Sequence, residues 1–473
     1  MILNQRSSEI NFEEKVIVLD EVDFYQIKNQ RVRFYQVEQM TLCADRTSGV
    51  VQQITEKEVT IVDNKVTTDS FDDVVPTGFL PLLLCYAQQR DFFSLFDHLN
   101  IPTKEVKYSH LDMVKTLIAA IACGCSYIKD INYKLRPYRA TANLIGLNIG
   151  FPEQSQVNRF LKSFDFHSLS RLVLIFDEAV KLLNSRKKVD IFDYDATGLV
   201  TYGKTYEFSK KGYVSKKRGD RGYILSAGYA HNYILANFLD PGNTNHGSRF
   251  WDSIYAAADI FGFDNIGMIR ADGIQGTGPN IEELIKIDKQ FIIRGYHPST
   301  AKNFSKGLYE YQWSTFEDGV SICDIGWQRI TNCKYPVRVI LQRYYKPKKK
   351  EYIFRHIYCN NTKLKADEIV LLYNDRIEIE SMYKSSKNGL HINKLNTRNY
   401  LGLNVSIYFT FLVHNLITSF RKEVLNKLGL ENIGINEITR RLMDIPAKVG
   451  DDNLLIFPEA HPYVKRLLYN PHL

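Results

Sequence analysis

The feature that most constrains the fold of this chain is a block of alternating strand and helix patterns that begins at Val189. Short apolar, β-branched runs predict strands, and amphipathic runs with a period of about 3.6 residues predict helices. In chain order the block contains predicted strands at 189–200, 222–232 and 233–243, a helix at 248–261, a strand at 265–272, a helix at 279–287 and a strand at 289–296. This order predicts a mixed α/β domain.

Aspartates stand at two places in this block where a carboxylate can reach the edge of a sheet. Asp195 follows the apolar start of the first predicted strand, and Asp193 competes with it because residues two apart share a strand face. Asp272 ends the fourth predicted strand, in R-A-D-G, which suits a site at the sheet edge. Each could instead be a turn residue or a helix cap. Spacing alone therefore leaves the choice between Asp193 and Asp195 open.

A third carboxylate stands in a second pattern, on a predicted helix at 373–387. Tyr373, Arg376, Glu380 and Lys387 are separated by three, four and seven residues, which places them on one helical face. A carboxylate so placed can hold a divalent metal, and the cations beside it suit a phosphate. The alternative is a solvated, charged helix face.

Charge is distributed unevenly along the chain. Residues 1–75 hold 8 Lys and Arg against 14 Asp and Glu, a balance of −6, so the rest carries 8 − (−6) = +14. A basic main body favours a polyanionic partner, most simply nucleic acid, although +14 over so long a stretch is only modestly basic. The seven scattered cysteines are typical of reduced thiols in a cytoplasm. We expect no membrane partner, because no apolar run approaches the roughly 20 residues of a span and the N-terminus lacks a signal-peptide pattern.

The spacing Y-x2-R-x3-E-x6-K in YNDRIEIESMYKSSK resembles the signature of the DDE transposases of bacterial insertion sequences. In that family the Glu is the third catalytic carboxylate, and the first Asp stands in a D-x-T motif, which favours Asp195 over Asp193. The resemblance implies an α/β fold with an RNase H-like catalytic domain. It also implies that Asp195, Asp272 and Glu380 are catalytic and hold two Mg²⁺ or Mn²⁺ ions.

The same resemblance implies the reaction and the partners. We expect cut-and-paste cleavage and strand transfer of double-stranded DNA at the terminal inverted repeats of the element, through a DNA hairpin, by a homodimer on the bacterial nucleoid. Tyr373, Arg376 and Lys387 would contact the DNA near the scissile bond. Two alternatives stay open: a host nuclease on the same scaffold, and a transposase-derived DNA-binding protein that no longer cuts.

Other predicted DNA contacts lie in two segments outside the signature. A basic, aromatic loop contributes Lys210, Lys211, Lys216, Lys217 and Arg218, which either track DNA or form a solvated hairpin tip. Between Asp272 and Glu380 lies a gap of 108 residues, where this transposase subgroup carries a β-rich insertion. Trp313 and Trp327 in that insertion either stack on a flipped base or form its core.

The sequence predicts a chain of several parts. They are a β-rich N-terminal module of unknown role at 1–75, a helical, DNA-binding region at 76–187, the catalytic domain at 188–299 and 363–400, the β-rich insertion at 300–362, and a helical C-terminal region at 401–473. Within the first helical region, Ser109 and Ser168 are predicted helix N-caps.

Overall fold

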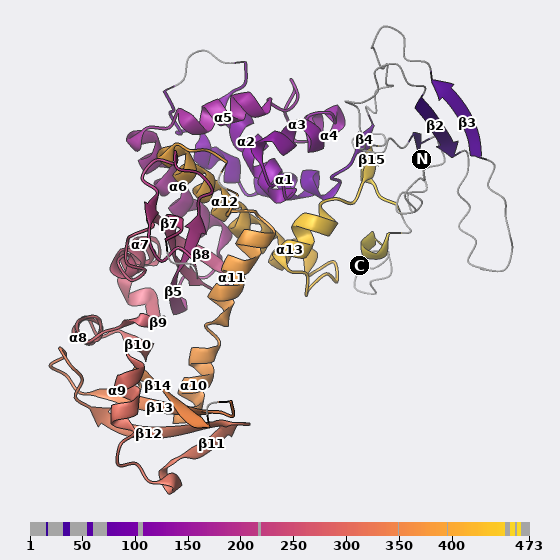
Figure 1. Ribbon diagram of the computed structural model, residues 1–473. Coiled ribbons are helices and arrows are strands. Elements are labelled where there is room, and N and C mark those ends of the chain that lie inside the picture. Colours follow the sequence, from indigo (N-terminus) through magenta and orange to yellow (C-terminus); the bar gives the residue numbers. More distant parts are fainter. Residues whose placement is uncertain are drawn as a thin grey trace, which may run out of the picture.

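The computed structural model describes residues 73–464 apart from short gaps, together with three strands nearer the N-terminus (Figure 1). The gaps are 103–106, 216–218, 349, 395, 450–454 and 459–460, and the strands are β1 (Val16–Ile17), β2 (Val32–Val37) and β3 (Ile54–Val59). These three strands form an antiparallel sheet of their own. The rest of residues 1–72 lies outside the described part of the chain.

A ten-stranded sheet forms the centre of the described structure. Five of its strands belong to the predicted α/β block: β5 (Val189–Val200), β7 (Arg221–Ala230), β8 (Tyr233–Pro241), β9 (Ile266–Gly276) and β10 (Gln290–Gly295). In the chain, α7 (Phe250–Phe261) lies between β8 and β9, and α8 (Gly278–Lys286) lies between β9 and β10. β5 pairs in parallel with β9, and β9 with β10, whereas β7 runs antiparallel to both β5 and β8. The predicted order of three strands, helix, strand, helix, strand is therefore confirmed.

One predicted strand boundary in this block is wrong. The fourth strand does not end at Asp272 but continues to Gly276. The register of β9 against β10 shifts after Ile293, and pairing resumes with Gly295 opposite Gly276. A Cβ on Gly276 would lie 2.0 Å from the carbonyl oxygen of Arg294, so only glycine allows this close approach. The glycines that suggest a loop in the sequence permit strand pairing in the fold.

Four further strands extend the same sheet. They are β11 (Ser314–Glu317), β12 (Val320–Gln328), β13 (Val337–Lys346) and β14 (Glu351–Cys359), after the short helix α9 (Pro298–Phe304). β14 pairs antiparallel with β10, and the order continues outward through β13 and β12 to β11. The β-rich segment is thus continuous with the central sheet and lies at its far end in Figure 1.

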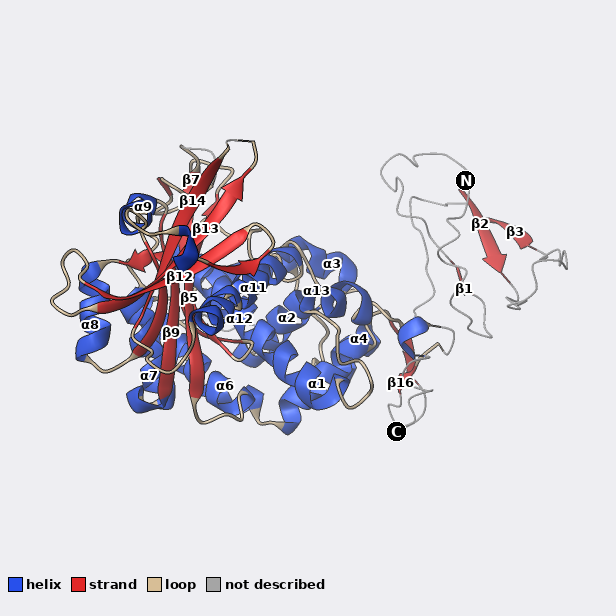
Figure 2. Ribbon diagram, turned by 90° about the horizontal axis from the view of Figure 1, so that it is seen from below, coloured by secondary structure: helices blue, strands red, loops and turns tan. Residues whose placement is uncertain are grey.

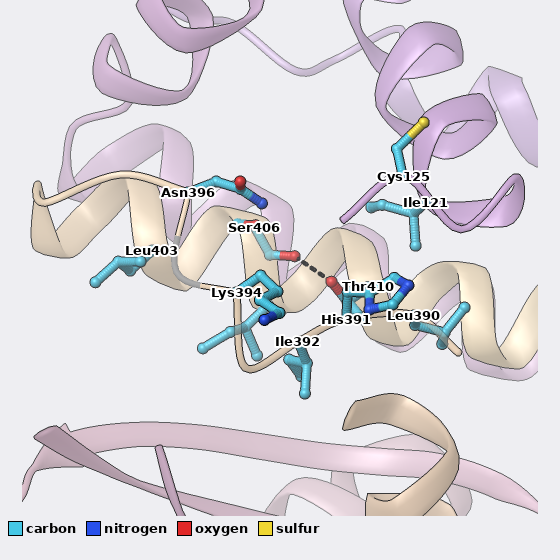
Figure 3. Close-up of a pocket in the computed structure, with 11 residues that line it drawn as sticks. Ile121, Cys125, Leu390, His391, Ile392, Lys394, Asn396, Leu403, Ser406 and Thr410 are labelled. Carbon is cyan, nitrogen blue, oxygen red and sulfur yellow. Dashed lines mark hydrogen bonds between the residues drawn. The ribbon is translucent and has the colours of Figure 1, made fainter. Parts of the chain in front are cut away.

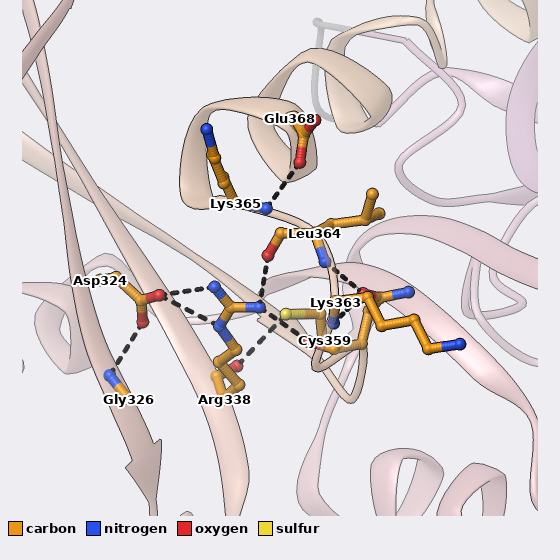
Figure 4. Close-up of polar contacts among 9 residues, drawn as sticks. Asp324, Gly326, Arg338, Cys359, Lys363, Leu364, Lys365 and Glu368 are labelled. Carbon is orange, nitrogen blue, oxygen red and sulfur yellow. Dashed lines mark hydrogen bonds and ion pairs between the residues drawn. The ribbon is translucent and has the colours of Figure 1, made fainter.

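Arg338 on β13 ties this outer part of the sheet to the segment that leads into α10 (Ala366–Asn374) (Figure 4). Its guanidinium donates to Asp324 Oδ2 at 2.7 and 3.1 Å. It also donates to the backbone carbonyls of Asn361 and Leu364, both at 2.8 Å. The start of α10 is therefore held by the sheet.

Helices pack on both faces of the central sheet. Figure 2 shows α7 and α8 on one side, and α11 (Ile377–Asn388) and α12 (Tyr400–Phe420) on the other. The helices that precede the sheet are α1 (Phe79–Gln89), α2 (His110–Ala122), α3 (Ile131–Lys134), α4 (Arg139–Leu144), α5 (Gln154–Lys162) and α6 (Phe166–Leu183). After α13 (Ile435–Glu437), a small sheet joins β15 (Ala447–Val449) to β16 (Leu455–Ile456) and to β4 (Val74–Val75).

α12 is the central helix of the helical part. It packs against α6, α2, α5 and β8, and nearly every residue from Val405 to Phe420 is buried. Contrary to the expectation from apolar runs, the helical stretch Tyr400–Leu425 is long and apolar enough to cross a membrane. However, 83% of its most apolar window is buried inside the protein, as in the core helix of a globular domain.

Of the two predicted N-caps, Ser109 is confirmed and Ser168 is wrong. Ser109 caps α2, where its hydroxyl accepts from the Asp112 amide at 3.1 Å. Ser168 does not cap α6, because the helix begins two residues earlier, at Phe166. The cap is Asp165, whose carboxylate accepts from the Ser168 amide at 2.8 Å, so Ser168 is the third residue of a capping box.

Asp177 on α6 offers a test of the packing between α6 and α7. Burial raises the pKa of its carboxyl to about 7, against the opposing effect of Lys181, and the carboxylate of Asp259 on α7 adds to the increase. A folded-state pKa above the ordinary 3.8 means that this carboxyl lowers stability as pH rises from about 4 through about 7.

Asp177→Asn should therefore raise the melting temperature at pH 8, by about 1 °C for each kcal/mol relieved, and leave it unchanged near pH 4. Thermal unfolding at both pH values measures this difference. Glu178→Gln, on the exposed side of the same helix, is the matched control and should show no comparable gain. An equal effect of the two variants would contradict the raised pKa of the partly buried Asp177.

Candidate active site

The three aspartates of the candidate site lie on neighbouring strands, two on β5 and one on β9. Asp193 is directly opposite Arg270 in the parallel pairing of these strands. Asp195 and Asp272 come two residues later on their strands, and residues two apart share a face of the sheet. The sheet therefore brings together two aspartates that are 77 residues apart in the sequence.

α11 brings the third carboxylate to the same face. Tyr383, one turn after Glu380, donates its hydroxyl to the backbone oxygen of Asp195 at 2.9 Å and lies 3.2 Å from that of Leu225. Burial raises the pKa of Tyr383 well above its ordinary value, so the hydroxyl keeps its proton and remains a donor. The helix that carries Glu380 is thus bonded to the strand that carries Asp195.

Asp195 has the electrostatics expected of a carboxylate in an acidic cluster. Burial raises the pKa of this carboxyl to about 6, and the negative charges of Asp272 and Glu380 add to the increase. The guanidinium of Arg376 opposes it. Asp272 is partly buried, and its Oδ1 accepts from the backbone amide of Ile274 at 3.0 Å.

Arg376 bridges two of the three carboxylates. Its Nη1 lies 3.7 Å from Asp195 Oδ2, and its Nη2 lies 3.4 Å from Glu380 Oε1. The Arg376 side chain is only 10% exposed, whereas that of Glu380 is 60% exposed. Glu380 therefore approaches the cluster from the solvent side, and Arg376 forms its inner wall.

The donor set fits Mg²⁺ or Mn²⁺ in chemistry. Asp195 is a buried carboxylate whose charge is destabilised, and a hard cation with oxygen ligands is the partner that would relieve it. In the part of the chain that the structure describes, no group of three or more Asp, Glu, His or Cys side chains lies close enough to hold an ion. The assignment of Asp195, Asp272 and Glu380 as metal ligands stays a prediction.

The other members of the helical signature are held within the protein. Lys387 Nζ lies 2.6 Å from Thr197 Oγ1 on β5, and burial lowers the pKa of this lysine. Tyr373 is partly buried, and burial raises the pKa of its hydroxyl against the influence of Arg376 and Arg294. Tyr373, Arg376 and Lys387 therefore lie around the acidic cluster, which Glu380 joins from the solvent side. The prediction of one helix over 373–387 is wrong, because α10 ends at Asn374 and α11 begins at Ile377, so Tyr373 stands on a different helix from Glu380.

The predicted DNA contacts of the basic loop are described only in part. Lys210 and Lys211 form β6, and both of their side chains are exposed. The backbone of β6 pairs with the start of β7. Lys216, Lys217 and Arg218 lie outside the described residues.

The two tryptophans of the β-rich segment differ in their surroundings. Trp313 packs against the main core, and the guanidinium of Arg343 lies 4.5 Å from its ring centroid. Trp327 is 48% exposed, on β12 opposite Arg338. Trp327 is therefore the more accessible indole of the two.

Two arginines near the site were missed by sequence reasoning. Arg270 forms a buried ion pair with Asp193, at 2.6 Å between Nη2 and Oδ2. Arg294 on β10 acts electrostatically on Tyr373. For Arg270 the only signal in the sequence is a cation in an otherwise apolar strand, which calls for a buried partner.

A small cavity of about 30 Å³ lies away from these carboxylates (Figure 3). It opens between α2, α12 and the segment after α11, and its lining includes Cys125, His391 and Thr410. No carboxylate lines it, so it offers no alternative centre for the acidic chemistry.

Comparison with known proteins gives the class of this chain. The family described as "Transposase DDE domain group 1" matches residues 93–470, which include the central sheet and all three carboxylates. The chain belongs to this family and is a DDE transposase, an enzyme of DNA transposition. The predicted transposase is thereby confirmed, and its assignment to the bacterial subgroup with the Y-x2-R-x3-E-x6-K signature stays a prediction.

The chain is also similar to solved structures, among them a piggyBac transposase synaptic complex with hairpin DNA determined by cryo-electron microscopy. The sequence identity is 11% and the TM-score 0.45, over 84% of this chain and 83% of that chain. No curated protein matches the chain.

The contrast between Asp193 and Asp195 generates a stability prediction. Asp193→Asn should lower the free energy of unfolding by about 3–5 kcal/mol, because it leaves the buried charge of Arg270 without its partner. Asp195→Asn should instead raise stability above pH 6, because it removes a carboxylate whose folded-state pKa lies above the ordinary 3.8. This gain should disappear below pH 4.

Urea unfolding of the two variants at pH 8 and pH 4 checks both signs. If Asp193→Asn unfolds no more readily than Asp195→Asn at pH 8, the assignment of the buried ion pair to Asp193 is wrong.

Proposed function

We propose that this transposase excises and inserts an insertion sequence of bacterial origin by cleaving DNA at the ends of the element. The catalytic residues are Asp195, Asp272 and Glu380, on an RNase H-like arrangement of strands in which the first two stand on neighbouring strands and the third on a helix. The substrate is double-stranded DNA that carries the terminal inverted repeats of the element, bound by a homodimer.

The observation that carries this proposal is the convergence of the helical signature on Asp195. Arg376 contacts both Asp195 and Glu380, Tyr383 bonds to the Asp195 backbone, and Lys387 reaches Thr197 in the same D-A-T segment. Residues whose spacing matched a signature in the sequence thus meet the strand that carries the first acid. A surface helix with a coincidental charge pattern would not place them there.

The chemistry follows from the oxygen-rich site. Two Mg²⁺ ions, when bound, would lower the pKa of a water molecule and stabilise the charge that develops on the phosphodiester. Asp195, Asp272 and Glu380 would hold these ions. The attack of water on a phosphorus atom breaks one P–O bond, and the leaving oxygen takes up a proton as a 3′-OH. That 3′-OH then attacks a phosphodiester of the opposite strand, which forms a hairpin on the element and releases a 3′-OH on the flanking DNA. A second water opens the hairpin and frees the 3′-OH of the element again. This 3′-OH attacks a phosphodiester of the target, joins the element to it and releases a 3′-OH of the target strand.

Phosphates of the cleaved strand would approach from the side of Glu380, which is the exposed carboxylate. Arg376 and Lys387 then lie just behind the scissile bond, and Tyr373 beside them. Each cation has a partner within the free protein. Contact with a phosphate would therefore exchange one of these partners for the DNA, so part of the binding free energy is spent on rearranging the site.

The DNA path beyond the site is proposed from exposed cations and aromatic rings. Lys210 and Lys211 on β6 lie at the edge of the sheet, in the same loop as the predicted contacts Lys216, Lys217 and Arg218. Of the two tryptophans, Trp327 is the better candidate for stacking on a flipped base because Trp313 is already covered by Arg343.

The catalytic assignment predicts that Asp195→Asn, Asp272→Asn and Glu380→Gln each abolish cleavage and leave DNA binding within about twofold. Removing one acid takes away a metal ligand but no phosphate contact. Cleavage is measured on a supercoiled plasmid that carries the gene with its bordering DNA, in Mg²⁺, and binding is measured on the same DNA by gel shift.

Glu378→Gln is the matched control, since Glu378 is exposed on the same helix, two residues from Glu380. It should cleave at the wild-type rate. Wild-type cleavage by any of the three acid variants would remove that residue from the site. Binding without cleavage by the wild-type protein would favour a transposase-derived DNA-binding protein, and cleavage without preference for the bordering DNA would favour a host nuclease.

The DNA path predicts a change in the salt dependence of binding. Replacing Lys210 and Lys211 together by Ala should reduce the slope of log K against log salt by about two, because each phosphate contact contributes about one unit. Fluorescence anisotropy between 50 and 200 mM salt measures the slope. Lys181→Ala and Lys286→Ala, which remove cations paired with acids on the surface of helices, serve as controls. An unchanged slope in the Lys210 and Lys211 variant would show that β6 does not contact DNA.

A further inference from the structure

Beneath the carboxylate cluster lies a buried ion pair that links both strands of the site. Arg270 Nε donates to Asp193 Oδ1 at 2.8 Å, and Nη2 donates to Asp193 Oδ2 at 2.6 Å. Both side chains are less than 5% exposed. Two parallel hydrogen bonds between a guanidinium and a carboxylate fix the orientation of both groups. The pair stands on the same face of the sheet as Asp195 and Asp272, two residues earlier on each strand.

The third guanidinium nitrogen of Arg270 contacts the C-terminal end of α10. Nη1 donates to the backbone oxygen of Leu372, in the last turn of α10. The last four carbonyls of a helix have no partner within the helix, so this contact satisfies one of them and places a cation at the negative end of the helix dipole. Two residues, Asp375 and Arg376, separate α10 from α11, which begins at Ile377 and carries Glu380.

We propose that Asp193 and Arg270 are positioning residues that set the angle between α10 and α11, and so place Glu380 opposite Asp195 and Asp272. The proposal rests on the proposed roles of these three acids. Neither Asp193 nor Arg270 touches the reacting phosphate. Their effect passes through the Leu372 carbonyl to the joint between the two helices.

The distance from this joint to Glu380 shows why the angle matters. Four residues separate Arg376, at the joint, from Glu380, which is about 6 Å along the axis of α11. A tilt of 10° at the joint would move the Glu380 backbone by roughly 1 Å, and a misplacement of about 1 Å costs on the order of 100-fold in rate. Tyr383 holds the far side of α11 on β5. With the two anchors together, the helix cannot rock without breaking a buried contact.

The experiment separates this positioning from ordinary stabilisation by replacing the whole pair. Asp193→Val with Arg270→Met puts apolar side chains of similar total volume in place of a buried ion pair, a change that is often neutral or stabilising. We expect the melting temperature to stay within a few degrees and DNA binding within twofold. Single-turnover cleavage of the plasmid with its bordering DNA should fall at least 100-fold. Hydrogen exchange of the amides at 375–380 should become faster.

Arg270→Lys is the conservative variant. It keeps the positive charge, but a single ammonium group cannot replace the planar guanidinium that bonds to both Asp193 oxygens and to the Leu372 carbonyl at once. It should fold normally and lose at least tenfold in cleavage. The control replaces an exposed ion pair between Arg186, just before β5, and Asp190, on β5, by Arg186→Met with Asp190→Val, and should change neither cleavage nor exchange.

Wild-type cleavage by the Arg270→Lys variant, or by a folded double variant, would overturn the proposal. A parallel Glu380→Gln measurement keeps this outcome apart from a failure of the proposed function. If Glu380→Gln is inactive while the double variant is fully active, only the positioning role is lost. If Glu380→Gln still cleaves, the catalytic role of Glu380 itself is wrong.

Discussion

The candidate site depends on how the negative charges of Asp195, Asp272 and Glu380 are tolerated close together. Arg376 is the cation that faces all three, and it contacts two of them directly. Its single charge does not compensate three carboxylates, which agrees with the raised pKa of Asp195. A site that remains short of positive charge within the protein is one that favours divalent cations. The incomplete compensation of charge therefore agrees with the proposed binding of divalent cations. It also makes the free site less stable than a fully paired one would be.

Much of the fold was predictable because the strand and helix periods between Val189 and Gly295 are long and regular. The candidate site residues came from a different signal, namely the fixed spacing of a four-residue signature for Glu380 and the D-x-T motif of the resembling family for Asp195. The choice between Asp193 and Asp195 was not settled by spacing, because both stand on one strand face. Only the structure shows that Asp193 is already occupied by Arg270.

Other features were not predictable because they arise from contacts between distant segments. The pair of Arg270 and Leu372 spans 102 residues, and the bond between Lys387 and Thr197 spans 190. No local pattern records such contacts. The true end of β9 was missed for a related reason: the glycine at 276 reads as a loop residue until the close approach of β10 explains it. The start of α6 was misplaced because Asp165 and Ser168 are both good caps, and only the backbone decides which one begins the helix.

The long interval between Asp272 and Glu380 also has a physical resolution. A separate insertion joined by loops would leave the third acid poorly placed relative to the first two. Here β14 instead returns the chain to the central sheet beside β10, so the segment before α10 starts from a strand of the same sheet. Arg338 then holds the entry to α10, and Arg270 holds its exit. Because both ends of α10 are bonded to strands of one sheet, the position of Glu380 is set by the rigid sheet rather than by the length of the interval.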